Sequence, residues 1–145
     1  MIRGFDVNQT ELVEAVADKM RREKVLSPPA WASFVKTSPA KDRVPSQQDW
    51  WYIRGASILR RFYMDNRPKG VNRLRVVYGD KTKNRYSGKH FMPASGAAIR
   101  KIMQQLEAYG LTKKVKVDKH YGRRITPAGI SFIDAAAKSI EKSEK

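Results

Sequence analysis

The stretch SQQDWWYIRGASILRRFYMD, residues 46–65, decides the fold of this chain. At 100° per residue, its apolar side chains fill one broad arc of a helix and a narrower strip on the far side. The arc holds Trp51, Tyr52, Gly55, Ala56, Ile58, Leu59, Phe62 and Tyr63, and the strip holds Trp50, Ile53 and Met64. A helix that is apolar on nearly all sides is buried. We therefore expect a central helix, capped by Ser46 and wrapped by the rest of the chain.

Three arginines interrupt the apolar surface of this helix. Arg54 and Arg61 lie seven residues apart on its narrow polar face, and Arg60 lies between the two apolar zones. A buried charge is costly unless it is paired, so each arginine must reach solvent, a partner or an internal carboxylate. Asp49 and Asp65 are the internal candidates for Arg54. The sequence leaves an internal ion pair and an external partner both open.

Aromatic residues and a glycine of the same helix indicate close packing. Trp50, Trp51, Tyr52 and Phe62 could stack on nucleic-acid bases, but aromatic residues at helical spacing are more often core, which we expect for Trp51 and Phe62. Gly55 costs up to about 1 kcal/mol inside a helix. Its place on the apolar arc predicts that another helix packs closely there.

Length and composition bound the class of protein. A chain of 145 residues with 41% hydrophobic residues predicts one domain, residues 1–145, with a real core and frayed ends at 1–5 and 142–145. No apolar run approaches a membrane span, so no membrane partner is expected. The absence of cysteine excludes disulfides, thiolate nucleophiles and cysteine-bound zinc, and fits a cytoplasmic protein.

The net charge of +16 is concentrated in one segment. Residues 67–124 contain 16 basic and 3 acidic residues, net +13, whereas residues 1–66 carry net +3 and residues 125–145 are neutral. General solubilising charge would mix the two signs along the chain. The concentration predicts a surface that binds phosphates.

The N-terminal part reads as two helices. Asn8 can cap the first, with Glu11 as the reciprocal capping residue. Residues 30–35 predict a short second helix whose Trp31 and Phe34 are core or interface anchors. The buried face of the first helix is expected to contain Leu12, Val13, Val16, Ala17 and Met20.

The basic segment contains alternating and helical patterns. Residues 73–78 alternate and predict a half-buried strand, and residues 79–89 predict a basic loop that becomes ordered on nucleic acid. Ser95 caps the next helix and Gly110 follows its end. The apolar face of that helix is expected to contain Ala98, Ile99, Ile102, Met103, Leu106 and Tyr109.

The C-terminal part predicts a β-hairpin followed by a helix. Residues 111–126 form the hairpin, which turns at 118–122, and Thr126-Pro127 starts an apolar final helix. A helix, a basic hairpin and a helix in this order resemble a winged-helix unit. The fold class is therefore mainly α, with helices around a central amphipathic helix and a winged-helix-like helix–β-hairpin–helix half. DNA-binding transcription regulators share this unit, so the pattern is weak for function.

Short blocks along the chain resemble one known family. The block DWWYIRGAS, residues 49–57, resembles the Asp-Trp-aromatic-Tyr-x-Arg-x-Ala-Ser signature of e-type ribosomal protein S-nineteen, which archaea and eukaryotes share and which is unrelated to its bacterial namesake. This chain departs from the family at Gly55, often alanine there, at Gly88-Lys89, often Pro-Ser, and in the loop of residues 79–89, which matches only in being basic. Matching blocks are VNQ (7–9), PAW (29–31), VKT (35–37), VYG (77–79), HF (90–91), SG (95–96), RK (100–101), LE (106–107) and GRRITPAG (122–129).

The resemblance implies a structural constituent of the small ribosomal subunit. It implies a place in the subunit head, binding to ribosomal RNA, a role in subunit maturation and a cytoplasmic location. Neighbouring small-subunit proteins and assembly factors would be partners of a chain that is a monomer when free. The family's arginines important for assembly correspond to Arg54, Arg60, Arg100 and, as a lysine here, Lys101.

The expected chemistry is recognition of folded RNA, without catalysis. No nucleotide-binding or nucleophile motif is found, and His90 and His120 lack a carboxylate cluster for a metal, so neither an enzyme nor a cofactor is expected. The alternatives are a dimeric winged-helix DNA-binding regulator and a protein-interaction module built on Trp31 and Phe34. The candidate RNA-binding residues are Arg54, Arg60, Arg61, Arg73, Arg75, Lys81, Lys83, Arg85, Lys89, Arg100, Lys101, Lys113, Lys114, Arg123 and Arg124.

Overall fold

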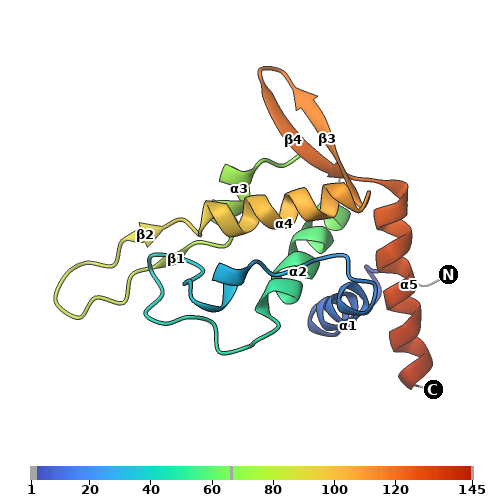
Figure 1. Cartoon of the computed structure of the whole chain (residues 1–145), viewed down its shortest axis with the longest axis horizontal. Helices are drawn as coiled ribbons and strands as arrows, with labels where there is room; N and C mark the ends of the chain where they lie inside the picture. Colours follow the sequence, from blue (N-terminus) through green and yellow to red (C-terminus); the bar gives the residue numbers. More distant parts are fainter. Residues whose placement is uncertain (1–2, 66, 145) are drawn as a thin grey trace.

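The computed structural model describes residues 3–65 and 67–144 and is mainly α-helical, which confirms the predicted class (Figure 1). Its helices are α1 (Gln9–Arg22), the 3-10 helix η1 (Ala30–Ser33), α2 (Trp50–Met64), α3 (Val71–Val77), α4 (Gly96–Ala108) and α5 (Pro127–Glu144). Two antiparallel hairpins pair β1 (Asp80–Lys81) with β2 (Phe91–Met92) and β3 (Thr112–Val117) with β4 (His120–Ile125).

Helix α2 is the centre of the fold. It packs against α1, α4, α5 and β4, and its Trp51 and Phe62 are 1% exposed, which confirms them as core. A side chain approaches Gly55 closely, but it is Leu26, which follows α1 and lies outside any helix, rather than a residue of a neighbouring helix. A Cβ at this position would lie 2.2 Å from Cδ1 of Leu26 and 3.6 Å from Cγ2 of Ile102 in α4.

The start of the central helix differs from the prediction. The N-cap is Asp49, whose carbonyl accepts the amides of Tyr52 and Ile53, so Ser46 lies outside the helix. Pro45 precedes the helix and lines pockets beside the Trp50 ring. The segment before the helix therefore lies beside Trp50, which capping patterns in the sequence do not reveal.

The N-terminal helices agree with the sequence in part. Asn8 caps α1 by accepting the amide of Thr10, but no reciprocal bond from Glu11 is present in the described part of the chain. The short second helix is a 3-10 helix and ends before Phe34, which is 81% exposed and therefore not core. Trp31 packs edge-on against Trp51, with ring centroids 5.6 Å apart. As predicted, Leu12, Val16, Ala17 and Met20 of α1 are buried.

The predicted strand over residues 73–78 is wrong: Val71–Val77 form helix α3. Val71, Leu74 and Tyr78 have the spacing i, i+3, i+7 of one helix face, and Leu74 is fully buried. Val76, which an alternating strand would bury beside Leu74, is 60% exposed. Apolar and basic residues alternate along residues 73–78, but buried and exposed side chains do not.

Helix α4 and the second hairpin follow the prediction with two corrections. Gly110 ends the helix with φ +91°, in the left-handed region that favours glycine, but Tyr109 is 47% exposed and donates its hydroxyl to Glu23 at 3.1 Å. The hairpin turn is tighter than predicted, because Asp118 takes a φ of +50° and β4 already begins at His120.

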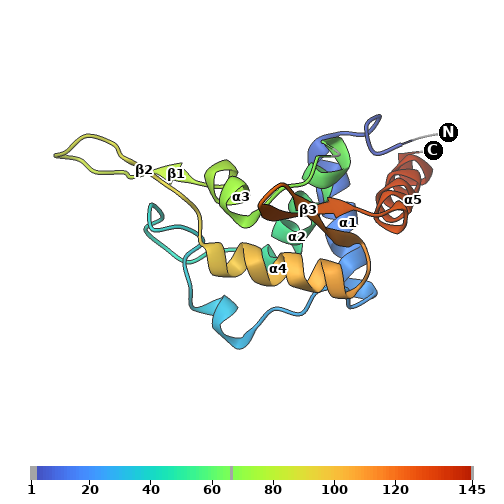
Figure 2. The same ribbon diagram turned by 90° about the horizontal axis from the view of Figure 1, so that it is seen from above.

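The hairpins and α5 mark the outer parts of the molecule (Figures 1 and 2). The loop between β1 and β2 and helix α5 lie at opposite ends of the long axis in both views, and β3–β4 projects from the body. Of the ends expected to fray, residues 1, 2 and 145 lie outside the described residues. Gly4 is buried, its amide bonds Tyr63 and Asp134, and α5 continues to Glu144.

Candidate nucleic-acid interface

The basic segment forms one half of the fold. Residues 67–124 comprise α3, both hairpins and α4. Two of the three acidic residues of this segment are already engaged: Asp80 pairs with Lys41, and Glu107 pairs with Arg123. The hydrogen bond from Lys41 lowers the pKa of Asp80, which keeps this carboxylate ionised. Asp65, just before the segment, pairs with Lys69 and Arg67. The segment itself keeps a net charge of +13.

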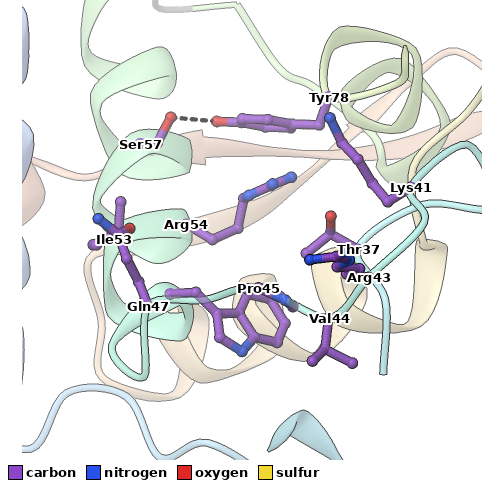
Figure 3. A pocket seen from close by; sticks show the side chains of 11 residues that line it. Thr37, Lys41, Arg43, Val44, Pro45, Gln47, Ile53, Arg54, Ser57 and Tyr78 are labelled. Atoms are coloured by element: carbon purple, nitrogen blue, oxygen red, sulfur yellow. Dashed lines mark hydrogen bonds between the residues drawn. The ribbon is translucent and has the colours of Figure 1, made fainter. Parts of the chain in front are cut away.

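Arg54 and Arg61 act on the same partner, as their shared helix face predicted. The guanidinium carbon of Arg54 lies 4.3 Å from the centre of the Tyr78 ring, and that of Arg61 lies 5.4 Å from it. The Tyr78 hydroxyl lies 2.7 Å from the Ser57 hydroxyl, which fixes the ring between α2 and the end of α3 (Figure 3). Cation–π contacts of this kind orient a guanidinium without neutralising it.

The internal ion pair considered for Arg54 does not form. Asp49 pairs with Arg21 at 2.9 Å and Asp65 with Lys69 at 3.1 Å, and no described carboxylate lies within ion-pair distance of Arg54. Burial lowers the pKa of Arg54, although an arginine stays charged at any physiological pH. A half-buried, unneutralised cation is thus held at the surface of α2.

Arg60 occupies a different side of α2. Its Nε is buried and makes no hydrogen bond among the described residues. A buried donor without a partner costs roughly 1–3 kcal/mol. The sequence places Arg60 apart from Arg54 and Arg61, between the two apolar zones, and the cation–π contacts with the Tyr78 ring come from Arg54 and Arg61.

Arg75 differs from its neighbour Arg73. Arg73 is exposed, whereas Nε of Arg75 donates to the carbonyl of Ala94 at 2.9 Å. The Arg75 side chain also closely approaches Gly96, where a Cβ would lie 3.1 Å from its Cδ. Arg75 therefore braces α3 against the start of α4.

Arg100 lies beside the second hairpin. It lines a hollow of about 570 Å³ together with Asn72, His120 and Tyr121. On the same hairpin, Nζ of Lys114 lies 4.5 Å from the centre of the Tyr121 ring, which is 59% exposed. The structure thus brings a cation of α4 next to the hairpin, as the sequence predicted.

Arg123, a candidate RNA-binding residue of the hairpin, forms an internal ion pair. Its Nε donates to Glu107 Oε2 at 2.8 Å, and the side chain is only 17% exposed. Its backbone also bonds that of Lys69 in both directions, at 2.9 and 3.0 Å. Arg123 therefore joins α4, β4 and the chain before α3. The sequence does not show that Glu107 and Arg123 meet.

The other candidate cations are exposed. Those on the β1–β2 hairpin stand on a loop that extends from the body (Figure 1), and the others lie on α4 and β3–β4. These residues are Lys81, Lys83, Arg85, Lys89, Lys101, Lys113 and Arg124.

Sequence reasoning missed three residues beside Arg54. Lys41 and Arg43, in a loop, line the same hollow as Arg54, and Tyr78 orients the guanidinium. Tyr78 could have been found from its helical spacing to Leu74, which the alternating residue types obscured. Lys41 and Arg43 carry no signal beyond their charge.

Neither a metal-holding group nor a membrane-spanning helix is found in the described part of the chain. Residues 3–65 and 67–144 contain no group of three or more histidine, cysteine, aspartate or glutamate side chains placed to hold a metal. None of the helices among them is long and apolar enough to cross a bilayer. Fold and charge together define a class of small, basic, mainly helical proteins suited to a polyanionic partner.

Comparison with known proteins gives the family. The model of the family Ribosomal protein S19e matches residues 4–143. The chain is 42% identical over 141 residues to "Small ribosomal subunit protein eS19" of Aeropyrum pernix, covering 97% of this chain and 90% of that protein. It is 38% identical to the protein of the same name from Emericella nidulans, covering 97% and 93%. The chain belongs to the ribosomal protein S19e family, which confirms the resemblance.

Family membership decides between the broad classes of function. Members are structural ribosomal proteins and not enzymes, so the chain has a structural role in the small subunit and is associated with the cytoplasmic ribosome. The family also removes the ground for a DNA-binding transcription regulator, which the helix–hairpin–helix pattern alone had left open.

Proposed function

We propose that this protein binds ribosomal RNA in the head of the small subunit and supports maturation of that subunit. The observation that carries the proposal is the concentration of charge: residues 67–124 carry net +13 on one half of the fold. Cations that neutralise RNA phosphates release counterions, which supplies most of the affinity for a highly charged partner.

The RNA surface is proposed to combine three groups of cations. Arg54 and Arg61 lie on α2, the loop cations follow Lys81, and Arg100 lies beside the β3–β4 hairpin. Basic side chains on three separate parts of the surface suit folded RNA, because proteins recognise structured RNA mainly by its shape and by contacts to its phosphates and 2′-hydroxyls. The free protein would be a monomer, with neighbouring small-subunit proteins and assembly factors as further partners.

The α4–β3–β4–α5 order supports a winged-helix-like half. Lys69 extends the hairpin by bridging to Arg123, so three chain segments lie side by side at its base. In this arrangement the exposed side of α4 and the hairpin meet phosphates together.

Arg100→Glu tests this proposal. Arg100 is exposed and charge reversal removes no internal ion pair among the described residues, so the melting temperature should change by less than about 2 °C. Incorporation into small subunits, measured by sedimentation of tagged protein, should be lost. A matched reversal at Arg22, outside the basic segment, should leave incorporation intact. Normal incorporation of Arg100→Glu, or a free dimer that shifts a DNA duplex instead, would contradict the proposal.

A further inference from the structure

A hollow beside α2 is built differently from the rest of the basic surface. It measures about 490 Å³, within the range of pockets that enclose a small ligand. One wall is α2, with Trp50, Ile53 and Arg54; another is the loop containing Val44 and Pro45. Tyr78 closes the top as drawn in Figure 3.

The charge of the lining selects an anion. Arg54, Lys41 and Arg43 all line the hollow, and none of its lining residues is acidic. Lys41 is paired with Asp80, outside the hollow, whereas Arg54 makes no ion pair among the described residues. The hollow therefore has cationic donors for a phosphate.

The other lining groups favour a ligand that has a planar base as well as an anionic group. Figure 3 shows Arg54 projecting between Tyr78 and the segment of Val44 and Pro45. Because the centre of the Tyr78 ring lies 4.3 Å from the guanidinium carbon, this planar group is held in place where it lines the hollow. Planar bases stack on guanidinium planes as well as on aromatic rings. Thr37 and Gln47 add hydrogen-bonding groups at the edge.

We propose that this hollow receives one unpaired nucleotide of an RNA strand, with the base against the Arg54 guanidinium and the phosphate at Lys41 and Arg43. The proposal rests on the proposed RNA-binding function and names the element recognised. A paired duplex keeps its bases stacked inside and presents only phosphates and groove edges. A concave site with apolar walls fits a nucleotide that has left the stack.

The segment that contains Lys41 and forms one wall of the hollow is bonded to the base of the β1–β2 hairpin. Lys41 pairs with Asp80 at the start of β1, and Ser38 donates to the carbonyl of Pro93 beyond β2 at 3.4 Å. The hollow therefore adjoins the base of the loop that carries Lys81 to Lys89. A strand following these loop cations could place one nucleotide in the hollow.

Mononucleotide titration tests the proposal on the intact protein. Adenosine and uridine 5′-monophosphate are compared with ribose 5-phosphate, which has the same sugar and phosphate but no base. NMR signals of the Arg54 Nε–H and the Trp50 indole N–H report on the hollow. Both nucleotides should shift these signals saturably, with affinity at least about tenfold above ribose 5-phosphate and a Kd in the millimolar range. Arg54→Lys keeps the charge but removes the plane, so it should abolish this discrimination; Arg22→Lys, a matched change outside the hollow, should preserve it.

Four results would overturn the proposal. They are equal binding of ribose 5-phosphate, binding of an acetylated Asp-Glu dipeptide in preference to nucleotides, full discrimination by Arg54→Lys, and no shift up to about 20 mM nucleotide. Binding of small-subunit ribosomal RNA by the wild-type protein is measured in parallel. If the protein binds the RNA but the nucleotide titration gives one of these four results, only the nucleotide site in the hollow is rejected. If the protein does not bind the RNA, the proposed function itself is rejected.

Discussion

The guanidinium of Arg54 lies over the ring of Tyr78 at 4.3 Å, with no described carboxylate near enough to neutralise it. This relationship joins the central helix to the C-terminal end of α3. Tyr78 is itself held by Ser57, 2.7 Å away. The core helix thus contributes an oriented cation to the basic half of the molecule.

Comparing Tyr78→Phe with Tyr78→Leu should separate the contribution of the Tyr78 ring from that of its hydroxyl. Phe keeps the aromatic ring beside the Arg54 guanidinium and removes only the hydroxyl contact to Ser57. The free energy of unfolding should therefore fall by about 1 kcal/mol. Its affinity for small-subunit ribosomal RNA should stay within about twofold of wild type. Leu removes the ring, so RNA affinity should fall further, as measured by filter binding. Equal RNA affinities for Phe and Leu would show that the ring does not position Arg54.

Arg123→Gln should behave as a change in stability. The Arg123 side chain is 17% exposed and bonds Glu107 at 2.8 Å, so its loss should cost about 1.5–3 kcal/mol in urea unfolding. Lys113→Gln, one strand away and exposed, is the control and should change stability by less than about 0.5 kcal/mol. An Arg123→Gln variant as stable as this control would show that the ion pair does not brace the hairpin.

Neutralising the β1–β2 loop should change the salt dependence of RNA binding. Lys81, Lys83, Arg85 and Lys89 are exposed, and replacing all four by glutamine should leave the melting temperature nearly unchanged. The negative slope of log affinity against log salt concentration should become shallower, by roughly 0.7 to 0.9 for each phosphate contact removed. Affinity measured between low and physiological salt gives this slope directly. An unchanged slope would exclude the loop from the RNA surface.

Gly55→Ala should destabilise the protein although alanine is the better helix former. The added Cβ would lie 2.2 Å from Leu26 Cδ1, so the packing of Leu26 against α2 must shift. Overpacking of this kind costs about 1–3 kcal/mol, more than the gain in helix propensity. In thermal unfolding, Gly55→Ala combined with Leu26→Ala should be more stable than the sum of the two single losses predicts. Strict additivity would mean that the two residues do not collide.

Alkaline pH should weaken the fold through Tyr63. Burial and the hydrogen bond to Asp134, with an O–O distance of 2.7 Å, raise the pKa of Tyr63 to about 12. Because the folded pKa lies above the unfolded value, this stabilisation is fully present below pH about 10 and is lost as pH rises towards 12. Urea unfolding at several pH values should show a steeper decline for wild type than for Tyr63→Phe. Parallel curves would contradict the assignment.

Long periodic segments were predictable from the sequence, whereas short ones were not. The apolar arc of α2 and the apolar face of α4 each repeat a pattern over several helical turns. Helix α3 has only seven residues, and its β-branched composition favoured a strand. The helix packs Val71 and Tyr78 beside Leu74 against the core and leaves Val76 60% exposed, whereas a strand would have buried Val76.

The candidate site was predictable in charge but not in geometry. The concentration of cations in residues 67–124 can be counted in the sequence. That Glu107 neutralises Arg123, or that Lys41 and Arg43 reach the hollow of Arg54, depends on contacts between segments far apart in the chain. Local patterns contain no information on such contacts.

Ultraviolet crosslinking of small subunits that contain the protein tests the central claim most directly. Crosslinked peptides identified by mass spectrometry should carry ribosomal RNA nucleotides on Arg54–Arg61, on the β1–β2 loop and on the segment from Arg100 to the β3–β4 hairpin. Crosslinks confined to α1 and α5, with none in these three regions, would contradict the assignment of the basic half as the RNA surface.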